Sequence, residues 1–357
     1  MKQKRRITKN TMWIYYLYKQ PKKKWLYAFL ISDIPMLILL APYLITYWDF
    51  LWAYPIPRLI SLLLAGFWTW LGPYLILKWY NFFEEFLSKI DGIPNSNGIA
   101  HKAYQTKILH LKYNKIIRIV WVLAVISILL LPIGRQNLIT YNLYGFKDIN
   151  YWIFIICVGY IAFFTSSFIL FMIYSGLEIK SIMENEAIVS YLLQNTGKKI
   201  SMSLIGDLIA KTSVYFCSGF FFFPIMKVFY SETQNMSFNT SAAVFILMGI
   251  FIGLIGVYLG IMNSIVCEKA QSSKDKLMES LETELHKIES CAAHCHKTEK
   301  LILYTVSRQE IRQQLYETSK MCTSPLETNQ CMRIVYGILM SAILPVITAF
   351  LLDMWKF

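Results

Sequence analysis

The chain contains few charged residues. Only 16% of its 357 residues are Asp, Glu, Lys or Arg, whereas a soluble domain carries about a quarter. It also lacks common enzyme signatures, since no Gly-rich nucleotide-binding loop, no G-x-S-x-G and no H-E-x-x-H occurs. No internal repeat is evident, which weighs against a transporter built from duplicated halves. We therefore expect a protein that is not an enzyme and that needs no cofactor.

The seven cysteines do not form the pattern of a disulfide framework, because they fall in apolar segments or on the expected cytoplasmic side. The one cluster with ligand-like residue types is Cys291, His294 and Cys295. Its spacing matches no zinc module and no haem attachment motif. We interpret it as part of an ordinary cytoplasmic helix and expect no metal site.

Acidic residues are absent from the first 24 positions, which hold nine Lys and Arg. The whole chain has a net charge of +13, which by itself fits a nucleic-acid partner. A basic cluster directly before an apolar segment fits anionic lipid on the cytoplasmic face better. We expect membrane lipid as a partner and no nucleic acid.

What the sequence does contain is long apolar runs, with 56% hydrophobic residues and a mean hydropathy of +0.44. Seven of these runs are long enough as helices, at about 1.5 Å per residue, to cross most of a 30 Å hydrocarbon core. The sequence therefore predicts an all-α integral membrane protein with seven transmembrane helices. These are Trp25–Trp48, Arg58–Tyr80, Ile116–Ile133, Tyr151–Tyr174, Thr212–Tyr230, Ala242–Val266 and Arg333–Leu352.

The distribution of Lys and Arg predicts a cytoplasmic N-terminus and, after seven crossings, an external C-terminus. The inner loops are long and helical in pattern, so we expect helices that continue into the cytoplasm and pack there. Glycines at 249, 253, 256 and 260 in the sixth span predict close helix approach. We expect a basic N-terminus (1–24), a six-helix transmembrane bundle (25–266), a cytoplasmic amphipathic helical anchor region (267–332), and the seventh helix with a short external tail (333–357).

The last span carries a stripe of residues at three- and four-residue steps, namely Ser341, Pro345, Thr348 and Leu352. Ser and Thr can line a narrow aqueous path, and Leu352 can close it by dewetting. One helix cannot enclose a pore, so a pore requires several copies around an axis. The alternative is an ordinary bundle helix, which these residues fit equally well.

Asp33 lies inside the first apolar run, just before Pro35. An ionisable group within a span is a candidate functional site, because its exposure to lipid is costly. The alternative is that the true crossing begins later and leaves Asp33 near the inner headgroups.

The layout of seven spans, an inner N-terminus, short outer loops and extended cytoplasmic helices resembles that of the insect gustatory and odorant receptor superfamily. The best local similarity is Asn263-Ser-Ile-Val-Cys-Glu-Lys-Ala-Gln after the sixth span, followed by a helical stretch and Val346-Ile-Thr-Ala-Phe-Leu in the last span. That family carries a Thr-Tyr pair and a later Gln in its last span. Here Ala349 follows Thr348, and no Gln follows before Phe357.

The resemblance implies a subunit of a ligand-gated cation channel, a homo- or hetero-tetramer in the cell membrane. Thr348 would face the pore and Leu352 would form the gate. A small hydrophobic or sugar-like ligand would bind among spans two to six, with Phe67, Tyr160 and Phe163 as candidate contacts. Two other functions stay open: a transporter or permease subunit that uses Asp33 for a small or lipid-like solute, and a scaffold that works through its cytoplasmic helices.

Overall fold

A computed structural model gives the structure of the chain. It describes residues 55–94, 111–130, 147–194, 201–217, 238–294, 298–326 and 330–339, with a few isolated helical positions between 26 and 45. Every regular element in these ranges is an α-helix, which confirms the all-α prediction at this level.

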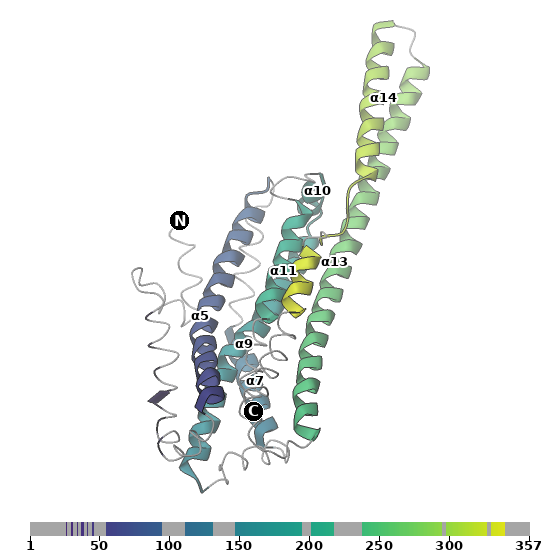
Figure 1. The fold of residues 1–357 in the computed structure, drawn as a ribbon. Coiled ribbons are helices and arrows are strands. Elements are labelled where there is room, and N and C mark those ends of the chain that lie inside the picture. Colours follow the sequence, from purple (N-terminus) through teal and green to yellow (C-terminus); the bar gives the residue numbers. More distant parts are fainter. Residues whose placement is uncertain are drawn as a thin grey trace, which may run out of the picture.

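The longer helices pack into an elongated body (Figure 1). α9 is the central helix, because it contacts α5, α7, α10, α11 and α13. The helices are α5 (Pro55–Asp91), α7 (Leu111–Leu130), α9 (Ile149–Met183), α10 (Glu186–Gln194), α11 (Met202–Cys217), α13 (Phe238–Ala293) and α14 (Thr298–Ser319). A further unlabelled helix covers 330–339.

Local sequence explains where α9 and α10 begin. Asp148 is in extended conformation before α9, and its carboxylate accepts a hydrogen bond from the backbone N–H of Asn150 at 2.8 Å. Asn185 does the same for α10, accepting from the N–H groups of Ala187 and Ile188 at 3.1 and 3.2 Å. Both are N-cap residues that satisfy donors left without intrahelical partners.

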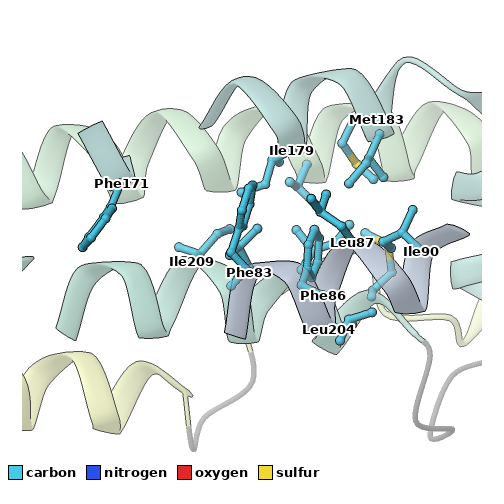
Figure 2. Close-up of a cluster of buried hydrophobic side chains, with 14 of the residues drawn as sticks. Phe83, Phe86, Leu87, Ile90, Phe171, Ile179, Met183, Leu204 and Ile209 are labelled. Atoms are coloured by element: carbon cyan, nitrogen blue, oxygen red, sulfur yellow. The ribbon is translucent and has the colours of Figure 1, made fainter. Parts of the chain in front are cut away.

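The buried core lies where α5, α9 and α11 meet (Figure 2). Phe83, Phe86 and Ile90 point from one face of α5 toward α9 and α11, as their three- and four-residue spacing predicts. Trp79 joins them, stacked between Phe83 and Phe171 with ring centroids 4.8 and 4.1 Å away. This aromatic packing joins α5 to α9.

Two described helical segments are long and apolar enough to cross a membrane, Ser166–Met183 and Ile252–Ala293. In the first, 61% of the most apolar window is buried within the chain, as expected of a central helix. In the second the share is 22%, so most of that apolar surface faces outward. Ile149–Tyr160 is a shorter apolar stretch of α9.

The predicted spans Arg58–Tyr80, Tyr151–Tyr174 and Ala242–Val266 lie within α5, α9 and α13. The spans Ile116–Ile133, Thr212–Tyr230 and Arg333–Leu352 are described only in part, and continuous helix in Trp25–Trp48 lies outside the described residues.

α13 continues unbroken through residues 266 and 267, where the sequence analysis divided bundle from anchor region. Its C-terminal part leaves the body, and α14 returns beside it as an antiparallel partner (Figure 1). We call this pair, residues 271–319, the hairpin. Lys274 of α13 fixes its base, because the ammonium donates to the carbonyls of Ser319 at 2.7 Å and Met321 at 3.0 Å. A lysine at these carbonyls supplies hydrogen bonds to groups left without partners at the C-terminal end of α14, and its charge complements the helix dipole.

Candidate functional site

A single arginine joins α7 to α9. Nη1 of Arg118 donates to the carbonyl of Phe163 at 3.2 Å, to Oγ of Ser166 at 3.1 Å and to Oγ of Ser167 at 2.9 Å. The guanidinium also lies over the Phe163 ring, 4.9 Å from its centroid, in a cation–π arrangement. We call Arg118 with Phe163, Ser166 and Ser167 the arginine site.

The sequence of α9 supplies two buried serines to this site. Ser166 and Ser167 are buried, with 0% and 1% exposure, on the face of α9 that meets α7. The hydroxyl of Ser166 donates to the carbonyl of Phe163 at 2.5 Å, which leaves its oxygen lone pairs directed at Arg118. α7 and α9 also meet at Gly159, where a Cβ would lie 3.6 Å from Cδ1 of Ile126, an ordinary van der Waals distance.

The charge of Arg118 is unusual for its position. It lies in the predicted span Ile116–Ile133, and no carboxylate among the described residues pairs with it. The phenols of Tyr80 and Tyr174 are close enough to interact electrostatically with the guanidinium. Within the described ranges, Nε and Nη2 of Arg118 and the buried Oη of Tyr174 have no hydrogen-bond partner. A charge that falls inside a predicted span is a candidate functional site.

A second polar feature crosses the core about two turns farther along α9. Nε1 of Trp79 donates to Oγ1 of Thr212 at 3.1 Å, and Oη of Tyr258 lies 2.7 Å from Oγ of Ser175. Tyr258 also lies close enough to Thr212 to interact with it, which makes the chain of contacts continuous. These four residues, which we call the polar network, connect α5, α11, α13 and α9. Because each is buried among apolar side chains, the network fixes the relative positions of the four helices.

The segment after the hairpin returns to the body at α11. A Cβ at Gly206 would lie 1.9 Å from the carbonyl oxygen of Pro325, so only glycine allows the segment to approach this closely. Nε2 of Gln330 donates to the carbonyl of Ser203 at 2.9 Å and to Oδ1 of Asp207 at 3.1 Å.

Arg333 adds an ion pair with Asp207 at 3.8 Å, and a Cβ at Gly337 would lie 3.4 Å from Cγ2 of Val214. We call this contact, of Ser203–Val214 with residues 325–326 and 330–337, the clasp. It attaches the start of the last helix to α11.

The structure locates part of the predicted ligand site. Tyr160 and Phe163 are half-buried on α9, and Tyr160 packs against the hydrophobic core. One face of the Phe163 ring is occupied by Arg118. Phe67 is in α5, but its side chain lies outside the described residues.

The predicted pore residues Ser341, Pro345, Thr348 and Leu352 lie outside the described residues, as does Asp33.

No group of three or more His, Cys, Asp and Glu able to hold a metal ion occurs within the described ranges. In the cluster singled out from the sequence, Nδ1 of His294 lies 2.8 Å from the carbonyl of Ser290 at the end of α13. Cys291 is exposed, and Cys295 lies outside the described residues.

Sequence reasoning missed the arginine site because it assigned Arg118 to the cytoplasmic end of its span. The available signal was its place as the third residue of Ile116–Ile133, followed by twelve uncharged residues, Ile119–Leu130. The partner serines gave no separate signal, since Ser is common in helices that pack closely.

Comparisons of the chain with known protein families, curated proteins and solved structures find no match. The functional interpretation therefore depends on the residues and geometry described above.

Proposed function

We propose that the chain is a multi-pass membrane protein with seven transmembrane helices and acts as a subunit of a chemoreceptor-like ligand-gated cation channel. Four copies surround an axis, and the helix that begins at 330 lines the pore with Ser341, Pro345, Thr348 and Leu352. The N-terminus is cytoplasmic and the C-terminus external.

The observation that carries this proposal is the clasp. The hairpin leads through residues 320–326 into the last helix, and this connection lies against α11 at Gly206. The pore helix therefore begins at a point held by both the hairpin and the bundle. A ligand that shifts α11 relative to α9 moves the start of the pore helix, because the clasp and the polar network share α11.

Helix length supports the proposed membrane arrangement. α13 has 56 residues, or about 84 Å at about 1.5 Å per residue, whereas the hydrocarbon core is about 30 Å thick. α5 and α9, with 37 and 35 residues, also exceed that thickness. Each helix can cross the bilayer and continue into a cytoplasmic layer, where the aromatic core of Phe83 and Phe86 lies.

The first experiment is native mass spectrometry and electron microscopy of the purified protein in detergent, followed by current recording in planar bilayers. Four copies around a central path, with a cation current, are the expected result. In a cysteine-free background, Thr348→Cys should let a charged thiol reagent block the current. Ser290→Cys, on the exposed end of α13, is the matched control and should leave the current unchanged.

A monomer with no conductance would overturn the channel proposal. Solute transport that is lost in Asp33→Asn would then favour a transporter.

One observation favours a scaffold as a second candidate. α14 exposes Ile302, Leu303 and Val306 with 62%, 65% and 49% exposure, although it lies beyond the body. Such an apolar surface fits a protein partner. Deletion of residues 340–357 would spare partner binding by a scaffold but would abolish the current of a channel.

A further inference from the structure

The geometry points to the arginine site as a binding site for one anionic phospholipid of the inner leaflet, with the headgroup phosphate on Nε and Nη2 of Arg118. This inference rests on the membrane placement in the proposed function, but not on conduction.

The first argument is that the nitrogen atoms of the Arg118 guanidinium have different roles. The three hydrogen bonds of Arg118 to described residues all come from Nη1, which holds the side chain against Phe163, Ser166 and Ser167. Among the described residues nothing accepts from Nε or Nη2. These two nitrogens form the planar fork that matches two oxygens of a phosphate. The protein thus orients the group at one nitrogen and leaves the fork available.

The second argument is charge. Three neutral acceptors and an aromatic face lower the cost of placing a cation here, but they do not neutralise it. No ion pair of Arg118 with a described carboxylate occurs, and Lys115 lies one turn nearer the cytoplasm with an exposed side chain. Two positive charges three residues apart lie on neighbouring parts of the same helix and favour an anionic ligand.

The third argument is the exposed apolar surface of α7. Ile119, Val120 and Leu123 follow Arg118 on α7 with 57%, 58% and 56% exposure. At about 100° per residue they lie roughly 100–200° around the helix from Arg118, so they form the outer face of α7 rather than a wall of the arginine site. Such a face fits the acyl chains of a bilayer, so lipid headgroups are the expected anions next to this helix.

The fourth argument is depth. The apolar run beyond Arg118, residues 119–133, extends for about 22 Å at about 1.5 Å per residue, less than the roughly 30 Å of the hydrocarbon core. Arg118 therefore lies near the inner edge of the hydrocarbon, where a headgroup phosphate can meet it. Inner leaflets carry the anionic lipids that such cations attract.

The test is lipid retention, measured by native mass spectrometry of the full chain in detergent after delipidation and titration with phosphatidylglycerol. Wild type should bind one phosphatidylglycerol molecule per subunit about tenfold or more tightly than Arg118→Gln, because a charge-assisted hydrogen-bonded contact is lost. Phosphatidylcholine with the same acyl chains should bind no better to wild type than to the variant.

Two further variants keep the result interpretable. Lys78→Gln removes an exposed cation that lies 5.9 Å from the Tyr74 ring on α5, and it should retain wild-type binding. Arg118→Lys keeps the charge but loses the fork, so it should bind weakly while its elution volume and melting temperature stay near those of wild type.

Equal phosphatidylglycerol binding by wild type and Arg118→Gln would overturn the inference, as would an equal loss in Lys78→Gln. Displacement of the lipid by millimolar inorganic phosphate would assign the site to a soluble anion instead. A protein that conducts but shows no Arg118-dependent retention refutes the lipid site alone. Recovery of the chain from the soluble fraction, without membranes, would refute the proposed membrane placement.

Discussion

At the scale of single residues, Thr212 links Trp79 of α5 to Tyr258 of α13 in the polar network. It accepts a hydrogen bond from Trp79 and contacts Tyr258, and all three side chains are buried. Thr212→Val has nearly the same shape but leaves the indole N–H without an acceptor. We expect a loss of about 1–3 kcal/mol in unfolding free energy, measured by thermal unfolding in detergent micelles.

The matched control for Thr212 is Thr283→Val, because Thr283 donates to the carbonyl of Glu279 on an exposed face of α13. It should change the stability little. Equal effects of the two substitutions would show that the polar network does not stabilise the fold.

The closest approach between the two segments of the clasp is at Gly206. The added Cβ of Gly206→Ala would meet the backbone of Pro325, which cannot rotate away as a flexible side chain can. We expect the segment 321–326 to move off α11, with a loss of roughly 1–3 kcal/mol. Hydrogen exchange in residues 321–339 should speed up and report the displacement.

Gly256→Ala is the control for the clasp substitution, because no atom lies within 4 Å of a Cβ built at that exposed position. Alanine is the better helix former, so stability should stay the same or rise by up to about 1 kcal/mol. A destabilisation as large as that of Gly206→Ala would contradict the assignment.

At the scale of helices, the base of the hairpin is tied to α10 by an exposed ion pair between Lys276 and Glu186. The hydrogen bond from Lys276, together with its positive charge, holds the pKa of Glu186 below its ordinary value of 4.5. A carboxyl whose pKa is lowered by folding stabilises the fold above its unfolded pKa and loses that contribution as the pH falls through the folded value.

We therefore expect α10 to exchange its amide hydrogens faster at pH 4 than at pH 7, after correction for intrinsic rates. Glu186→Gln should remove most of that difference, and Glu282→Gln, on the exposed face of α13, should preserve it. The effect should shrink in high salt, because exposed pairs are screened. An unchanged pH response in Glu186→Gln would exclude the ion pair as its cause.

Helical periodicity accounts for the packing face of α5. Phe83, Phe86 and Ile90 are buried because residues three and four apart share a helix face, and this rule needs no knowledge of the partner. The same reasoning failed for the glycines of α13. Close approach was expected there, but Gly249, Gly253, Gly256 and Gly260 have no atom within 4 Å of a built Cβ among the described residues. Small residues permit an approach without specifying a neighbour.

The arginine site and the clasp show what periodicity could not predict. Arg118 is separated from Ser166 by 48 positions, and Gln330 from Ser203 by 127. Such pairs depend on which helices become neighbours, and that follows from the whole set of buried surfaces rather than from any local pattern. Apolar length predicted the helices, but their order in space came only with the structure.

At the scale of the whole molecule, the proposed topology places the hairpin and the C-terminus on opposite sides of the membrane. An epitope inserted at residue 296, between α13 and α14, should be stained only in permeabilised cells. An epitope after Phe357 should be stained in intact cells. Staining of the residue-296 epitope in intact cells would mean that the orientation is reversed.

The continuity of α13 has a consequence for inherited variation. In one unbroken helix each residue advances the phase by about 100°, so a one-residue deletion between the body and the hairpin would rotate everything beyond it by that angle. Lys276 would then face away from Glu186, whereas Lys274 and Ser319 would turn together with the hairpin. A seven-residue deletion restores the phase to within about 20° and would shorten the helix by about 10 Å. Length changes in this region should therefore be tolerated in steps of seven residues and rejected as single residues.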